Sequence, residues 1–152
     1  MRNRKIILLI PILVLALITA QCGRKRPPFL PKKEFPVKVG QLEAVWEDGA
    51  FHLKGTVIYP QDWPKQMQTI SGCSVYHACY PPDNPPCEGC PLDLAPFQKI
   101  EGTVAMEKAF SCYVPMEKKQ GIHFFKVRLI GEGGETGPFS DHAKVIITDQ
   151  GY

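Results

Sequence analysis

The chain has 152 residues, 18 basic and 15 acidic side chains, a formal charge of +3 and six cysteines. Because the first 21 residues hold three of the basic side chains and none of the acidic ones, the remainder is formally neutral, which excludes the broad positive surface that nucleic-acid binding needs. The length permits one domain of ordinary size, and the cysteine content is typical of an oxidising compartment such as the periplasm or the cell surface.

Residues 1–21 have the pattern of a secretory signal peptide. Arg2, Arg4 and Lys5 form a basic start, and an apolar run from Ile6 to Ala20 follows. That run has 15 residues, whereas a helix that spans a bilayer needs about 20. A basic start, a short apolar segment and small residues near a cleavage site predict a signal that is removed after export.

The end of this segment, Thr19-Ala20-Gln21-Cys22, resembles the lipobox of bacterial lipoproteins. The resemblance implies cleavage before Cys22, a diacylglycerol on its thiol and a fatty acid such as palmitate on its new amino group. It also implies a lipid-anchored protein of the cell envelope, and Gly23 after the cysteine implies the outer membrane if the cell is Gram-negative. Thr19 and Gln21 differ from the residues that the lipobox prefers, so an ordinary secretory signal and an uncleaved anchor stay open as alternatives.

Residues 22–37 are predicted to form the lipidated cysteine and a tether. Positions 23–37 contain four prolines and five basic residues without an amphipathic period. Extended at about 3.1 Å per residue, such a spacer spans on the order of 45 Å and lifts a folded domain clear of the lipid headgroups. Its basic residues either touch anionic headgroups, at about 1 kcal/mol per charge, or remain solvated.

From residue 38 onward, apolar residues alternate with polar ones at the period of two that marks β-strands. Ala44 and Trp46 precede the turn signal Glu47-Asp48-Gly49, and Phe51 and Leu53 follow it, which predicts a hairpin. Seven or so short strands with regular turns, and no confident helix after the signal, predict an all-β fold, an immunoglobulin-like β-sandwich. The further predicted strands lie at 70–78, 97–100, 110–114, 122–130 and 142–148.

Several of these segments are similar to fibronectin type III domains. The stretch from Val127 to Ser140, with its glycine-rich turn at 131–137, is similar to the last hairpin of that family. Ile70–Tyr76 resembles its third strand, and Trp46–Gly49 resembles its first turn. The resemblance covers residues 38–149 and implies a fibronectin type III-like sandwich of about seven strands. It also implies a module that presents loops and sheet edges to partners and has no catalytic residues.

Three positions depart from the fibronectin type III pattern. Gly55 lies near the place of the family's core tryptophan, Phe125 takes the place of a tyrosine, and Cys73 replaces a common aromatic residue. The missing tyrosine removes a hydrogen bond that fixes one corner of the sandwich. The predicted core is therefore repacked, with Trp46 as a candidate replacement.

The insertion at 79–96 is rich in cysteine and proline, and Cys87-Glu88-Gly89-Cys90 is its most distinctive motif. A haem site is excluded because Pro91 stands where histidine is required, and a thioredoxin-like site lacks the βαβ setting. A structural zinc site needs four ligands, of which the motif supplies two. We interpret the motif as a disulfide staple of the insertion, which a bridge from Cys79 to Cys87 or Cys90 would stiffen further, and metal binding remains the main alternative.

Cys73 and Cys112 fall at inward positions of strands that are expected in opposite sheets. Sheets pack about 10 Å apart, whereas the Cα atoms of a disulfide lie roughly 5.5 Å apart. A bridge between these two residues requires a local pinch in the sandwich, and two buried free thiols are the alternative. If Cys22 is lipidated, five cysteines remain, and at least one of them has no disulfide partner within the chain.

The four histidines, His52, His77, His123 and His142, fall in separate strands without the spacing of a metal or catalytic motif. They are interpreted as solvated or edge-strand residues. A Ser-His-Asp or Cys-His site would have to assemble in space, and no motif points to one. We therefore expect no catalytic residue, no cofactor and no bound metal.

These observations predict a membrane-anchored envelope lipoprotein that acts as a non-catalytic protein-binding or structural module. Its expected partners are the membrane, through the lipid anchor, and envelope proteins of unknown identity, with no nucleic acid and no evident small-molecule substrate. The insertion is the predicted contact region, because its prolines limit the entropy lost on binding, and Tyr76, Tyr80 and Leu92 are the candidate apolar contacts. The alternative is a metal- or thiol-handling envelope protein that uses the cysteine loop at 79–90. A third and weaker hypothesis is an enzyme accessory subunit or a hydrolase.

Overall fold

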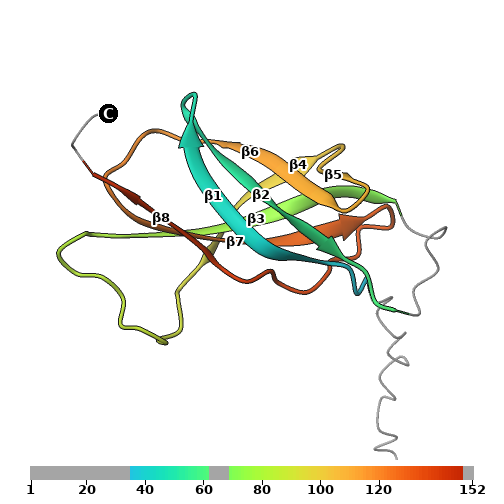
Figure 1. Cartoon of the computed structure of the whole chain (residues 1–152), viewed down its shortest axis with the longest axis horizontal. Coiled ribbons are helices and arrows are strands. Elements are labelled where there is room, and N and C mark those ends of the chain that lie inside the picture. Colours follow the sequence, from blue (N-terminus) through green and yellow to red (C-terminus); the bar gives the residue numbers. More distant parts are fainter. Residues whose placement is uncertain (1–34, 62–68, 149–152) are drawn as a thin grey trace, which may run out of the picture. The chain divides into compact units, whose positions relative to one another are not determined.

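The computed structural model describes residues 35–61 and 69–148, which form two antiparallel sheets (Figure 1). The predicted signal peptide, Cys22 and most of the predicted tether lie outside the described residues. Within the described ranges, every regular element is a β-strand, as the sequence predicts. These ranges contain no helix with the length and hydropathy needed to cross a bilayer.

The first sheet combines an N-terminal hairpin with two strands from the middle of the chain. Its strands are β1 (Lys38–Glu47), β2 (Ala50–Ile58), β5 (Ala105–Met106) and β6 (Ala109–Pro115). Their order is β1-β2-β6-β5, so β2 is hydrogen-bonded on both sides. The strand β5 has no signal in the sequence, because two residues are too few to show a period.

The second sheet holds the remaining strands, β3 (Ile70–Tyr80), β4 (Ala95–Glu101), β7 (Gly121–Gly131) and β8 (Ala143–Ile147). Their order is β4-β3-β7-β8, which places β4 at an edge, as predicted for residues 97–100. The two orders match the ABED and CFG sheets of immunoglobulin-like sandwiches, with β4 added next to strand C. The predicted fold class is confirmed.

The hairpin between β1 and β2 closes with a two-residue turn. Asp48 and Gly49 both have positive φ angles, 51° and 78°, and Glu47 ends β1 directly before them. Positive φ at both central positions is the type I′ geometry, which matches the twist of the strands and which Asp-Gly favours. Beside the turn, the ring of Trp46 meets Phe51 edge-on at 4.8 Å, so Trp46 packs against the core as the sequence suggests.

The core lies between the sheets and is built from side chains at alternate strand positions. Phe51 and Leu53 of β2, and Phe125, Val127 and Leu129 of β7, are completely buried. The charged residues between those of β7 are only partly buried, which confirms the predicted alternation. Burial of each large apolar side chain contributes about 1.5–3 kcal/mol to folding.

The packed domain begins earlier than the sequence predicts. Phe35 and Val37, which the sequence assigns to the tether at 22–37, are buried and belong to the core. A side chain at Gly131 would meet the ring of Phe35, and one at Gly137 would meet the backbone of Val37, so both glycines make room for this segment. Residues 35–37 therefore belong to the folded domain and not to the predicted tether. The error arose because Phe-Pro-Val is too short to show a period and follows a basic run.

Candidate functional site

The insertion between β3 and β4 is a loop of residues 81–94 that projects beyond the end of the sheet (Figure 1). Cys87 and Cys90 form a disulfide with their Cα atoms 5.3 Å apart, and both residues are exposed. The structure has no bridge from Cys79 to Cys87 or Cys90, because Cys79 is a free thiol. Its Sγ lies 3.8 Å from Nε2 of His123 instead. The disulfide therefore closes one turn within the insertion and does not tie the insertion to β3.

Cys73 and Cys112 are both buried and both free. The described part of the chain therefore contains two buried thiols here and no disulfide between the sheets. They lie at inward positions of β3 and β6, in opposite sheets, as predicted. The pKa of the Cys112 thiol is raised, first by its hydrogen bond with Cys73 and then by burial. The Cys112 thiol therefore stays protonated, and both buried cysteines pack as small apolar core residues.

We expect peptide mapping under non-reducing conditions to find one intramolecular disulfide, between Cys87 and Cys90. Cys79 is partly exposed and should be alkylated in the folded protein, whereas Cys73 and Cys112 should react only after denaturation. Metal analysis is the accompanying control. The described residues contain no group of three or more His, Cys, Asp or Glu side chains arranged to hold a metal ion. Stoichiometric zinc with every domain thiol reduced would contradict this pairing and support the metal alternative.

The three candidate contact residues lie on or beside the outer face of the second sheet. Tyr80 accepts a hydrogen bond from the backbone N–H of Asp93 at 3.1 Å, which fixes the end of the insertion to β3. Its ring also lies edge-on to that of Phe124 on β7, with 5.8 Å between centroids. Leu92 lines a groove together with Phe124, whereas Tyr76 belongs to a separate aromatic pair. The structure thus gathers two of the three predicted residues around Phe124.

A groove of about 650 Å³ runs between the disulfide turn and the strands β7 and β8. Lys126, His142 and Lys144 line it, and the Lys144 ammonium lies 6.0 Å from the centre of the Phe124 ring. Glu88 is the acidic side chain among the lining residues. The side of the groove opposite the disulfide turn is therefore lined by one phenylalanine ring, two lysines and a histidine. We name it the contact face, defined by Tyr80, Leu92, Phe124, Lys126, His142 and Lys144.

His77 and His123 form a pair in which His123 is buried and His77 is half-buried, so their interpretation as solvated or edge residues is wrong. They lie on β3 and β7, the two central strands of the second sheet. His77 Nε2 is 3.0 Å from His123 Nδ1, and His123 Nε2 is 2.7 Å from the carbonyl oxygen of Lys119. His123 is fully buried, with its ring 5.0 Å from that of Phe51. His142, in contrast, is exposed, as predicted.

The contacts of His123 fix its tautomer. A carbonyl oxygen only accepts, so Nε2 carries the proton and donates it to Lys119, and Nδ1 accepts a hydrogen bond from His77. Burial lowers the pKa of His77 to about 4, with His123 and Lys119 acting in the same direction, and burial also lowers the pKa of His123. Because Nε2 already holds a proton, His123 is not a base for the nearby Cys79 thiol, which excludes a Cys-His nucleophile at this place.

The free energy of unfolding is expected to fall as the pH drops from about 6.5 towards 4. The folded-state pKa of His77 is about 4, below the ordinary histidine pKa of about 6.5, so the unfolded chain takes up this proton first as the solution is acidified. The contribution is fully present above pH 6.5 and is lost through this window. We expect about 1–2 kcal/mol, after allowing for the partial exposure of His77.

Urea titrations across this pH range measure the effect. His77→Phe should flatten the pH dependence, because phenylalanine keeps the aromatic contacts and does not titrate. His142→Gln, at an exposed histidine, is the matched control and should leave the pH dependence unchanged. An unaltered slope in His77→Phe would refute the assignment to this pair.

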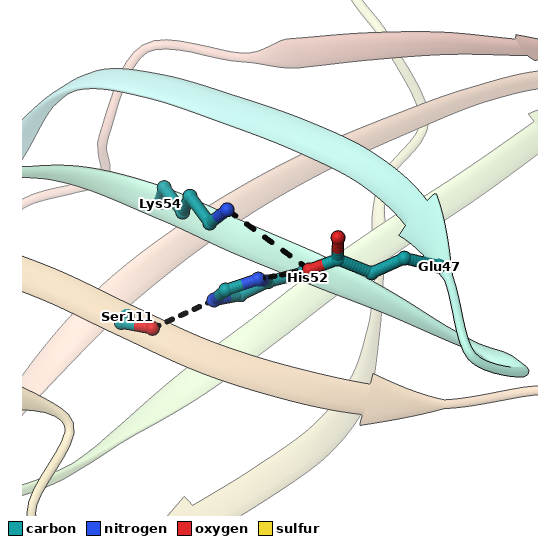
Figure 2. A network of polar contacts seen from close by, with 4 residues as sticks. All are labelled: Glu47, His52, Lys54 and Ser111. Atoms are coloured by element: carbon teal, nitrogen blue, oxygen red, sulfur yellow. Dashed lines mark hydrogen bonds and ion pairs between the residues drawn. The ribbon is translucent and has the colours of Figure 1, made fainter.

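A second polar network lies on the outer face of the first sheet (Figure 2). His52 Nε2 is 2.8 Å from Ser111 Oγ, and His52 Nδ1 contacts a carboxylate oxygen of Glu47. The Lys54 ammonium lies 4.0 Å from the same oxygen. His52 is only 7% exposed, because Tyr113 stacks on its ring at 4.0 Å. The interpretation of His52 as a solvated or edge residue is therefore also wrong.

The strand register explains how this network assembles. His52 is paired with Val45 across β1 and with Tyr113 across β6, and Glu47 and Ser111 each lie two residues away from those partners. Such diagonal neighbours on one face of an antiparallel pair are within reach of long side chains. The predicted turn already placed Glu47 and His52 on one hairpin, but Ser111 could be located only through the pairing of β2 with β6.

Comparison with known proteins gives similarity at the level of architecture. No protein-family model matches the sequence, and no curated protein matches it either. One similar solved structure is described as a myokine structure, with 12% identity, a TM-score of 0.43, and coverage of 74% of this chain and 97% of that chain. Another is the sixth fibronectin type III domain of human fibronectin type III domain containing protein 3, with 10% identity, a TM-score of 0.43, and coverage of 86% and 96%.

A third similar structure is pectate lyase Pel3 from Pectobacterium carotovorum. It is 10% identical with a TM-score of 0.38, and the match covers 73% of this chain but only 27% of the lyase. At these identities and TM-scores the likenesses transfer no residue role to this chain. The description of the fold rests on the strand order of the two sheets.

Proposed function

We propose that this protein is a membrane-anchored envelope lipoprotein whose contact face and insertion bind another protein without catalysis. The observation that carries the proposal is the 3.1 Å hydrogen bond from Asp93 to Tyr80, which fixes the insertion beside the aromatic and cationic groups of β7 and β8. A site that is held in place before binding loses less entropy when a partner docks. Aromatic anchors surrounded by polar groups are also typical of protein interfaces.

The anchoring part of the proposal rests on the first 22 residues. They combine a basic start, a short apolar run and Cys22 at the position where a lipoprotein carries its acyl chains. Each buried CH₂ group adds about 0.8 kcal/mol of membrane affinity, and stable anchoring needs more than one chain. A protein held in this way meets other envelope proteins at the membrane surface.

The charges of the contact face favour a partner with an acidic surface. Lys126 and Lys144 flank Phe124 in the groove, and beside it the Arg128 guanidinium lies 4.9 Å above the ring of Phe139. Complementary charge speeds association and selects against basic surfaces. We expect the partner to present aspartate or glutamate side chains around an apolar group that fits against Phe124.

Reversal of two charges in the groove should weaken partner binding by about tenfold or more, because attraction becomes repulsion. The variant is Lys126→Glu with Lys144→Glu, and the matched control is Lys108→Glu, at an exposed lysine on the turn between β5 and β6. Partners are crosslinked in intact cells, identified by mass spectrometry, purified and titrated at low and high salt. Equal affinity for the double variant and the wild type would contradict the contact face.

The exposed disulfide supports a second candidate function, thiol–disulfide exchange. Cys87 and Cys90 line the same groove as Lys126 and Lys144, whose charges would stabilise a thiolate. Equilibration with glutathione buffers separates the two functions. Exchange-active pairs have reduction potentials of about −120 to −270 mV, whereas structural bridges lie below about −300 mV.

A further inference from the structure

The polar network on the first sheet has the geometry of an activated serine (Figure 2). The Glu47 carboxylate only accepts hydrogen bonds, so His52 Nδ1 carries a proton and donates it to the carboxylate. With the ring proton on Nδ1, Nε2 is the acceptor, and Ser111 Oγ, 2.8 Å away, donates a hydrogen bond to it. Ser111, His52 and Glu47 are therefore hydrogen-bonded in series as nucleophile, base and orienting carboxylate. Serine hydrolases of several unrelated folds share this arrangement.

The surroundings of His52 hold its ring in this position. Tyr113 stacks on the ring with an interplanar angle of 20°, and β2 is paired along both of its edges. His52 is buried, whereas Ser111 is exposed at the surface of β6. A base that is shielded and fixed beside an accessible hydroxyl meets the geometric requirement for general base catalysis.

A groove of about 600 Å³ lies beside Ser111 and gives a substrate a place to bind. Ser111 and Tyr113 line it on β6, Ile100, Ala105 and Met106 are among its apolar lining residues, and Glu101 and Thr103 are polar ones. These side chains favour an apolar acyl or aryl group over a charged one. The groove therefore suits an ester whose carbonyl carbon lies at the Ser111 hydroxyl.

Few groups at this site can stabilise the negative charge that develops on the carbonyl oxygen of an ester during acyl transfer. The Ser111 backbone N–H donates to the Val104 carbonyl oxygen at 2.9 Å and is not available as an oxyanion donor. Lys54 is paired with Ser111 across β2 and β6 and is the nearby cation in the network. Preorganised oxyanion donors are usually the largest contribution to the rate of acyl transfer. We therefore expect slow turnover.

We propose that Ser111 is a nucleophile that accepts acyl groups from apolar carboxylic esters, with His52 as general base and Glu47 as a positioning residue. Ser111 Oγ bonds to the ester carbonyl carbon while its proton passes to His52 Nε2. The ester C–O bond then breaks, and the leaving alkoxide takes that proton, which leaves the acyl group on Ser111. A water molecule, deprotonated by His52, cleaves the acyl-serine, and the proton returns to Ser111 Oγ.

The test is covalent labelling of the full chain with a fluorophosphonate, in which serine oxygen bonds to phosphorus and fluoride leaves. We expect mass spectrometry to find the adduct on Ser111 and Ser111→Ala to abolish it. His52→Gln should slow labelling by about 10²-fold or more, which is the usual contribution of a general base. Glu47→Gln should slow it by a smaller factor and shift its pH profile, because the amide keeps a contact with His52 and removes the charge. Ser74, on β3 of the other sheet, is the internal control.

Thermal unfolding of each variant separates loss of the nucleophile from loss of the fold. A second measurement is independent of the His52 variant: a thiol in Ser111→Cys should react with iodoacetamide faster than one in Ser74→Cys, because His52 assists removal of the thiol proton. Labelling of Ser111 no faster than that of Ser74 in the folded protein would overturn the proposal. So would equal thiol reactivity in the two cysteine variants, and the network would then be a structural feature only.

Discussion

Phe125→Ala should lower the free energy of unfolding by about 3–5 kcal/mol, the usual cost of removing a buried aromatic ring. Phe125 is completely buried on β7, with its ring 4.7 Å from that of Phe51 and 4.8 Å from that of His77. Truncation leaves a cavity between the two sheets, and close-packed neighbours collapse into it only partly. Because domains of this size are stable by only about 5–15 kcal/mol, this one change removes a large fraction of the total.

Chemical denaturation of the purified protein measures this loss, and Phe139→Ala is the matched control. Phe139 is the same residue type on the outer side of the second sheet, with 46% of its surface exposed. Its removal should cost less than about 1 kcal/mol, because little apolar surface leaves a buried environment. Equal losses for the two variants would contradict the placement of Phe125 at the centre of the core.

Cys22→Ser should abolish attachment of fatty acid completely. A serine hydroxyl does not replace the thiol that carries the diacylglycerol in the lipoproteins that this N-terminus resembles. The protein should then remain as an uncleaved precursor or appear as a soluble secreted form. Loss of more than one acyl chain removes nearly all membrane affinity, since each buried CH₂ contributes about 0.8 kcal/mol.

Metabolic labelling with a fatty-acid probe, followed by membrane fractionation, measures the effect of Cys22→Ser. Cys79→Ser is the control, because Cys79 is a free thiol within the folded domain and should have no part in anchoring. The control should keep both the label and the membrane location. Unchanged labelling of Cys22→Ser would end the lipoprotein proposal, whereas binding through the contact face would still stand or fall by the charge-reversal experiment.

The parts of the fold that the sequence predicts are those with local signals. The alternation of Phe125, Val127 and Leu129 identified β7, and Asp48-Gly49 identified the first turn, because each pattern is complete within a few residues. Phe35 gave no such signal, since one apolar residue in a proline-rich and basic segment has no period around it. Its burial depends on tertiary packing against distant parts of the chain.

The candidate sites were harder to predict because they depend on pairing between distant strands. His77 and His123 are 46 residues apart, and His52 and Ser111 are 59 residues apart. Nothing local to any of these positions indicates which residues become neighbours. The inward position of Cys79 was predictable from the sequence. Alternate residues of a strand lie on the same face, and this alternation places Cys79 on the inner face of β3 together with Cys73. The prediction that placed Cys79 in the insertion did not take this alternation into account.

If the chain is anchored at Cys22 as proposed, the burial of Phe35 limits how far the folded domain can lie from the membrane. Only twelve residues, 23–34, separate Cys22 from Phe35. A fully extended chain gains at most about 3.6 Å per residue, so a lipid on Cys22 would keep Phe35 within about 45 Å of the membrane. A partner that pulls on the domain would load the contacts of Phe35 and Val37 first. The mechanical strength of the attachment would then be that of the hydrophobic core and not that of an exposed linker.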